Sequence, residues 1–279
     1  MIQGEGICFR LYTEAAYNRL QDANIPEIQR CNLGSAILQL KCLGQEPGEV
    51  DFMDPPDPNY SRFLFMHSSQ FALLPNTICA VKVSLLNLFG LGALDNKGVL
   101  TSIGRQMSNL PLEPSYARSL LASQQDGCTL EVLSIISLMS ASSKLFLDSS
   151  ESREAAHAAR QKFVHTSGDH LTFLNVIRAY ADIAQQASAA ARREWCRTHF
   201  VNERAVREAG EIMEQLKGIC DNIGLDWRAS CGDELEPVLK SLVRGLFQNV
   251  ALLHPDGQYK QVQGRTASQF RGLIRANGG

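Results

Sequence analysis

Several side chains that could hold a metal ion are close together in one short stretch of the sequence. Histidine nitrogens and carboxylate oxygens are common metal ligands, and this stretch contains His157, His165, Asp169 and His170. A bound metal ion is therefore one interpretation. The other is that Asp169, which follows Gly168 at the start of an apolar run, caps a helix, as a serine or asparagine would there. We favour the capping interpretation.

Motifs for nucleophilic catalysis and for phosphate binding are missing from the sequence. Cys196 and His199 are three residues apart and could share a helix face, as a nucleophile and its base would. Trp195 beside them favours packing instead. The sequence has no G-x-S-x-G motif and no G-x-x-x-x-G-K-[ST] loop. We expect no catalytic, cofactor-binding or metal-binding residues in this chain.

Basic side chains form two groups. The smaller group, Arg160, Lys162 and His165, precedes Gly168. The larger group has five arginines against two glutamates, an excess of three charges, and consists of Arg192, Arg193, Arg197, Arg204 and Arg207. Such groups can contact phosphates, whose charge dominates nucleic-acid affinity. The alternative is a solvated helix face with ion pairs such as Glu203–Arg207, and composition alone favours it.

Length and composition indicate an ordinary globular protein. The chain has 279 residues, 27 Lys+Arg, 29 Asp+Glu and a net charge of −2, with 44% hydrophobic and 20% charged residues. These values exclude a strongly basic nucleic-acid coat protein and overall disorder. The length predicts one large or two modest domains.

The eight cysteines show no C-x-x-C pair, and no signal peptide precedes them. We therefore predict reduced, buried thiols in a protein of the cytoplasm or nucleus. The longest apolar stretch runs from Ile78 to Leu94 and is interrupted by Lys82 and Asn87. It is too short for a membrane helix, so a buried helix is expected.

The first hundred residues alternate between helix and strand patterns. A short strand is predicted at Cys8–Tyr12, and a helix is predicted to begin at Pro26 and end at Gly44. Residues 59–80 follow neither a helical nor a strand period. A helix over 81–94, a turn at 95–98 with Val99-Leu100 returning as the second strand of a small hairpin, and a helix capped by Thr101 then form the order of a winged-helix unit.

From Pro111 onward the pattern is almost wholly helical, and the tail from Gly264 is expected to be loose. The predicted helices lie near 115–124, 129–140, 152–164, 169–185, 190–200, 203–224 and 234–249.

Short motifs in a fixed order connect this sequence to a known family. They are Gly6-Ile-Cys-Phe-Arg-Leu-Tyr-Thr13, Pro26-Glu-Ile-Gln-Arg30, Asp51-Phe-Met-Asp-Pro-Pro56, Leu91-Gly-Ala-Leu-Asp95, Leu100-Thr101 with Gly104-Arg105, Pro111-Leu112 with Pro114, Gly168-Asp-His-Leu-Thr172 with Asn175-Val176, and Trp195-Cys196 with Phe200. In this order and spacing, from about residue 4 to residue 262, the sequence resembles DEAH-box RNA helicases.

The resemblance implies a mainly α protein with four segments. Residues 1–24 resemble the end of the second RecA-like lobe, with the Cys8–Tyr12 strand separated from its sheet. Residues 25–110 resemble the winged-helix domain, 111–250 the helical ratchet domain, and 251–279 a truncated start of an OB-fold or a disordered tail. Two departures stand out. Residues 59–80 are an insertion or an error of the gene model, and Ala267–Gly279 lacks the family's OB strand.

By resemblance, the chain is the C-terminal part of an ATP-dependent RNA helicase that unwinds or remodels RNA. It would help to form the single-stranded RNA channel and, lacking the ATP motifs, would be inactive alone. ATP and magnesium would bind to the full-length protein and not to this chain. Expected partners are RNA, the RecA-like lobes and protein activators, with no membrane. The alternative is a helical protein-interaction module that does not touch nucleic acid.

The resemblance also suggests which side chains face RNA. The helix opened by Gly168-Asp-His-Leu-Thr172 is the first choice, because a helix amino end suits a phosphate. The predicted RNA-binding residues are Arg160, Lys162, His165, His170 and Asn175 around this helix, and then Arg204 and Arg207.

Overall fold

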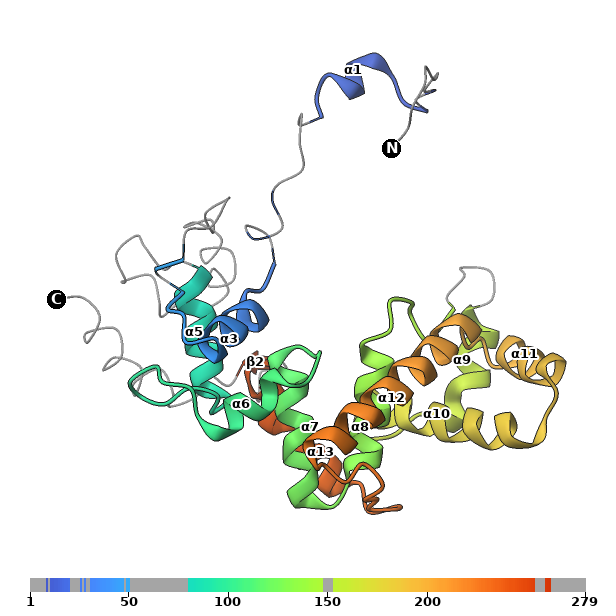
Figure 1. The fold of residues 1–279 in the computed structure, drawn as a ribbon. Coiled ribbons are helices and arrows are strands. Elements are labelled where there is room, and N and C mark those ends of the chain that lie inside the picture. Colours follow the sequence, from blue (N-terminus) through green and yellow to red (C-terminus); the bar gives the residue numbers. More distant parts are fainter. Residues whose placement is uncertain are drawn as a thin grey trace. The chain divides into compact units, whose positions relative to one another are not determined.

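The computed structural model describes residues 9, 11–20, 26, 28, 31–47, 49–50, 80–147, 153–253 and 259–261 (Figure 1). The chain divides into two units. One comprises Met1–Asn32 and Asp51–Ala80, and the other Leu33–Val50 and Val81–Gly279. The predicted insertion at 59–80 falls outside the described residues except for its last position.

Helix α1 (Glu14–Tyr17) is the one named element in the described part of the first unit. The Thr13 hydroxyl caps it by accepting a hydrogen bond from the Ala16 N–H. The strand predicted at Cys8–Tyr12 stays a prediction. Of its residues the structure describes Phe9, Leu11 and Tyr12, which are exposed and not in a strand.

The second unit begins with the elements of the predicted winged helix. Helix α3 (Gly34–Cys42) is followed by Gly44 at φ 75°, as the sequence predicts. Near the predicted start at Pro26 the structure describes Pro26 and Ile28, of which Ile28 is helical, whereas residues 31–33 are not helical and α3 begins at Gly34. Helix α5 (Ala80–Gly90) overlaps the predicted helix 81–94 but begins one residue earlier and ends four residues earlier.

The predicted hairpin and helix cap after α5 are confirmed. An antiparallel bridge joins Leu94 to Leu100. The Thr101 hydroxyl then accepts a hydrogen bond from the Gly104 N–H and begins α6 (Ser102–Ser108). It also donates to the Gly92 carbonyl at 2.7 Å. One side chain therefore ties the hairpin to the helix that follows it.

Helices α7 (Pro114–Asp126), α8 (Thr129–Met139) and α13 (Glu236–Leu246) pack against one another (Figure 1). Helix α8 is apolar on almost every side and is buried along most of its length, as expected of a central helix. Helix α7 ends at Gly127, which adopts a left-handed conformation (φ 66°) that favours glycine.

A second hydrophobic core lies among α9 (Arg153–Arg160), η1 (Gln161–Phe163), α10 (Asp169–Gln186), α11 (Ala189–Thr198) and α12 (Glu203–Ile223). Trp195 packs against this core, which confirms the packing interpretation. The buried residues of the core are Leu138, Leu145, Phe163, Val176, Cys196, Val201, Val206 and Ala209.

A buried carboxylate connects the loop before α13 to α8. Glu131 is 2% exposed and accepts hydrogen bonds from the Ser230 hydroxyl at 2.6 Å and from Arg178 Nη2 at 3.0 Å. Arg178 also donates to the Gly232 carbonyl at 2.8 Å. Such a carboxylate is tolerated inside a protein because charged and polar donors replace its water.

A 3-10 turn, η2 (Phe247–Asn249), follows α13. Strands β1 (Ala251–Leu253) and β2 (Tyr259–Gln261) then pair antiparallel, with Ala251 opposite Gln261. The fold class is therefore confirmed as mainly α. The domain boundaries, including an OB-fold start or disordered tail at 251–279, stay predictions, and residues 262–279 lie outside the described part.

The cysteine prediction agrees with the structure in the absence of disulfides among the described cysteines, and it is partly right for burial. Each of the six described cysteines is free. Cys128, Cys196 and Cys220 are buried, while Cys31, Cys42 and Cys231 are half-buried. Within the described residues, no helix is both long and apolar enough to span a membrane.

Candidate nucleic-acid interface

The first candidate surface, which we call the α9–α10 corner, comprises Arg160, Lys162, His165, His170 and Asn175. Gly168, at φ 115°, precedes the first residue of α10 and makes no side-chain cap. The prediction that Asp169 caps this helix is therefore wrong, because Asp169 is already its first residue. The Thr172 hydroxyl instead accepts the His165 N–H at 3.0 Å and donates to the Gly168 carbonyl at 3.2 Å.

Lys162 is exposed and is oriented by His199, which lies 37 residues further along the chain. Lys162 Nζ lies 2.6 Å from His199 Nε2, and His199 Nδ1 lies 2.7 Å from the Trp195 carbonyl oxygen. A carbonyl only accepts, so Nδ1 carries the proton and Nε2 accepts from the ammonium group. The ammonium also lies 5.0 Å from the Phe163 ring centroid. A charged group is therefore held in one place at the surface.

The two histidines of the corner, His165 and His170, are half-buried. His165 Nδ1 accepts the Ser167 N–H at 3.1 Å, which stabilises the turn before α10. Burial lowers the pKa of His170, and the neighbouring Asp169 opposes this only in part. His170 is therefore biased towards its neutral form, in which it can donate or accept a hydrogen bond but does not add a positive charge.

Arg160 and Asn175 direct their polar groups to the backbone of their own chain. Arg160 Nη2 donates to the carbonyls of Leu147 and, at 3.3 Å, Phe200. Asn175 Nδ2 donates to the Phe163 carbonyl at 3.0 Å. Both were predicted to contact RNA from sequence, and the structure places both in bonds that hold the corner together.

The second candidate surface, which we call the arginine face, comprises Arg192, Arg193, Arg197, Arg204 and Arg207. Most of these arginines are near a carboxylate. Arg193 lies 3.6 Å from Glu203, Arg197 lies 2.7 Å from Glu194, and Arg207 lies 4.0 Å from Glu211. The predicted Glu203–Arg207 pair is wrong, because Arg193 reaches Glu203 from α11.

Arg204 is exposed near Glu208. The pKa of Glu208 is lowered, mainly by hydrogen bonds from Ser142 and further by Arg204. Exposed ion pairs of this kind contribute about 0–1 kcal/mol. Phosphates can therefore replace the carboxylates on this face at small cost.

The structure supports neither a catalytic role for Cys196 and His199 nor a metal ion at the histidine-rich stretch. Burial raises the pKa of Cys196 to about 11, and the ring nitrogens of His199 contact Lys162 and Trp195 instead. In the described part of the chain, no three His, Cys, Asp or Glu side chains are placed to hold a metal ion.

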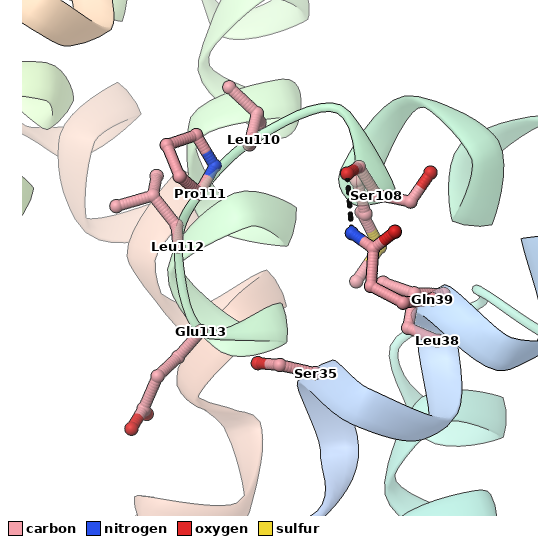
Figure 2. A pocket seen from close by; sticks show the side chains of 9 residues that line it. Ser35, Leu38, Gln39, Ser108, Leu110, Pro111, Leu112 and Glu113 are labelled. Carbon is pink, nitrogen blue, oxygen red and sulfur yellow. Dashed lines mark hydrogen bonds between the residues drawn. The ribbon is translucent and has the colours of Figure 1, made fainter.

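A cavity of about 350 Å³ lies between α3, the end of α6 and the segment that leads to α7 (Figure 2). Gln39 Nε2 crosses it to donate to the Ser108 carbonyl at 2.8 Å. Glu113 is the single ionisable residue in its lining, beside Ser35, Leu38, Met107, Leu110, Pro111 and Leu112. One carboxylate among apolar and neutral groups is not a catalytic constellation.

Sequence reasoning assigned His199 to the wrong neighbour. It considered His199 only with Cys196, whereas the structure joins it to Lys162. The available signal was the four-residue spacing of Trp195 and His199, which puts both side chains on one face of a helix. In the structure their ring centroids are 4.5 Å apart. Nothing in the local sequence indicates Lys162 as its partner.

Family models match two adjacent regions of the chain. Residues 84–112 match the winged-helix part of the helicase associated domain (HA2), and residues 113–173 match its ratchet-like part. The first range includes most of α5, the hairpin and α6, and the second includes α7 to the start of α10.

Curated relatives match over most of the chain. The ATP-dependent RNA helicase DHX33 of Mus musculus is 35% identical over 262 residues, which cover 92% of this chain and 33% of the relative. The human protein of the same name gives the same values. The pre-mRNA-splicing factor ATP-dependent RNA helicase DEAH10 of Arabidopsis thaliana is 33% identical over 271 residues, covering 94% of this chain and 35% of the relative. The chain thus spans about a third of the length of these relatives.

Proposed function

Because this chain belongs to the DEAH-box RNA helicase family, as its helicase-associated C-terminal region, we propose that it helps to line the path of single-stranded RNA in an ATP-dependent RNA helicase. The relatives carry the name ATP-dependent RNA helicase, and one is also named a pre-mRNA-splicing factor. The proposal covers RNA binding by this chain and remodelling of RNA by the whole protein.

The observation that carries the proposal is the arrangement at the α9–α10 corner. Lys162 holds an exposed positive charge in the segment that leads into α10, and Gly168 leaves the first amides of that helix without a side-chain cap. A helix amino end and a cation both favour a phosphate group. The arginine face adds exposed cations whose present partners are surface carboxylates. Contacts of this kind position a nucleic-acid backbone without reading its sequence.

ATP and magnesium are not assigned to this chain. The sequence has no G-x-x-x-x-G-K-[ST] loop, and the described residues have no cluster of metal-ligating side chains. The residues present do not fit these ligands, so no step of ATP hydrolysis is attributed to them. We propose that the chain alone does not turn over ATP, which a phosphate-release assay on the purified protein would check.

A salt titration of RNA binding tests the proposal. The affinity of the full 279-residue chain for a fluorescent single-stranded oligouridylate is measured between about 50 and 200 mM salt, concentrations over which phosphate contacts weaken strongly. We expect Lys162→Met to reduce the slope of log K against log salt by about 0.7, the value for one contact to a single strand. Lys240→Met on α13 is the matched control, since Lys240 is exposed and paired with Glu236 at 2.8 Å.

Two results would contradict the proposal. One is an absence of binding at the lowest salt concentration, which would favour the helical protein-interaction module. The other is equal salt slopes for Lys162→Met, Lys240→Met and the unmodified chain, which would place the RNA elsewhere. Arg204→Met and Arg207→Met, measured in the same way, test whether the arginine face contributes.

A further inference from the structure

Phe200 has an unusual backbone conformation at the connection between α11 and α12. Its φ is 53°, and it is the one non-glycine residue with positive φ among the residues that the structure describes. A bulky side chain rarely adopts this left-handed conformation unless the surrounding structure enforces it. Phe200 lies directly after His199, the residue that orients Lys162.

Backbone hydrogen bonds hold the residues on both sides of Phe200. An antiparallel bridge pairs Val201 with Phe146. The Leu147 N–H donates to the Phe200 carbonyl at 3.0 Å, and the Asn202 N–H donates to the Leu145 carbonyl at 2.7 Å. The segment 145–147 therefore forms a short ladder with the segment 200–202.

Arg160 joins the two sides of this ladder from the end of α9. Its Nη2 donates to the Leu147 carbonyl on one side and to the Phe200 carbonyl on the other. Its guanidinium carbon lies 4.5 Å from the centroid of the Phe146 ring. A planar guanidinium can stack on a ring and donate to separate carbonyls at once, whereas the compact ammonium of a lysine does not reproduce this geometry.

We propose that Arg160 is a positioning residue, which holds Phe200 in its left-handed conformation and so keeps His199 against Lys162. If Phe200 relaxed to a negative φ, the chain after α11 would leave in another direction and His199 would move with it. Nε2 would then leave Lys162, whose long side chain would regain rotamer freedom. The consequence for RNA binding rests on the proposed function, but the consequence for His199 does not.

The first test uses nitrogen-15 NMR of the histidine side chains in the full chain without RNA. The unmodified protein is expected to show His199, assigned by its loss in His199→Gln, as the neutral tautomer protonated at Nδ1. Arg160→Lys is expected to shift this signal towards a mixture of tautomers. Arg153→Lys, an exposed arginine of the same helix, is the matched control. An unchanged His199 signal in Arg160→Lys would overturn the proposal.

A second variant covers the case in which Arg160→Lys does not fold, which its thermal midpoint would show. Phe146→Leu removes the ring beneath the guanidinium and keeps an apolar side chain of similar size. It is expected to shift the His199 signal in the same direction by a smaller amount. A folded Phe146→Leu variant with the unmodified His199 signal would also count against the proposal.

The RNA measurement separates an indirect role from a direct contact. Lys162→Met and Arg160→Lys are each expected to weaken binding about fivefold, a value typical of one exposed ionic contact. Because both act through one ammonium group, the double variant should also be about fivefold weaker. A double variant about 25-fold weaker, the product of the two, would refute the indirect role. If the unmodified chain does not bind RNA, the proposed function fails, and the NMR measurement alone decides the role of Arg160.

Discussion

Gly245 allows α13 to approach α7 closely, and its replacement by alanine tests whether that approach stabilises the fold. An added Cβ atom would lie 2.0 Å from the Ser115 carbonyl oxygen and 2.2 Å from Ser119 Oγ. The first of these atoms belongs to the backbone of α7 and cannot rotate away. Ordinary contact begins at 3.4 Å, so the two helices would have to separate by up to 1.4 Å (3.4 minus 2.0).

The expected cost combines three contributions. Forcing extra volume into a packed interior costs about 1–3 kcal/mol. The hydrogen bond from Ser119 Oγ to the Leu242 carbonyl, at 3.3 Å, would be lost with about 1 kcal/mol. Alanine is about 1 kcal/mol more favourable than glycine inside a helix and offsets part of this. We therefore expect Gly245→Ala to lower the free energy of unfolding by about 2 kcal/mol.

Urea unfolding and thermal unfolding measure this effect, with hydrogen exchange of α7 and α13 to locate it. A loss of about 2 kcal/mol corresponds to a decrease of about 4–8 °C in the melting temperature. Gly210→Ala in α12 is the matched control, because its added Cβ would meet nothing within 4 Å. It should stabilise the protein by about 0.5–1 kcal/mol. A Gly245→Ala variant as stable as Gly210→Ala would refute the reasoning.

Glu131→Gln should destabilise the protein by about 2–3 kcal/mol, because it leaves Arg178 without its buried anionic partner. Urea unfolding measures this against Glu214→Gln, a change at an exposed glutamate that should alter stability little. Thr101→Ala should lower the free energy of unfolding by about 1 kcal/mol because the cap of α6 is lost, whereas Thr101→Ser should keep most of this stability. Equal melting temperatures for the two variants would contradict this expectation. The hairpin amides of Val99 and Lys97 lower the pKa of Asp95. The stabilisation of the hairpin should therefore be complete above the ordinary pKa of an aspartate and decrease as pH falls through the lowered pKa. Hydrogen exchange of the hairpin as a function of pH, with Asp95→Asn as the insensitive reference, measures this.

Helix positions in this protein follow from local sequence, and most of them could be predicted. The apolar stripe of α12 and the caps at Thr101 and Gly44 depend on contacts within about one helical turn. Even so, local reasoning assigned the cap of α10 to the wrong residue, although it predicted the start of this helix near residue 169 correctly. Asp169 and Gly168 are both acceptable at a helix start, and the Thr172 hydroxyl, which also bonds His165, was not part of the prediction.

The roles of the basic residues could not be predicted in the same way. Arg160, Lys162 and Arg204 all appear in sequence as cations in helical segments. In the structure, Arg160 binds backbone carbonyls, Lys162 binds His199, and Arg204 stays exposed. The outcomes for Arg160 and Lys162 depend on residues that the sequence separates widely from them, and whether such a pair meets is decided by packing.

The sequence by itself determined most of the helices, the cap at Thr101, the hairpin and the family, because these depend on short-range contacts and on the order of motifs. Only the tertiary structure decided which cations remain available to a phosphate and which hold the chain together. It also decided that Gly245 must be small and that Phe200 is held in a left-handed conformation. The physical reason is that these properties arise where distant segments meet, and there the free energy depends on packing and on which polar groups find partners.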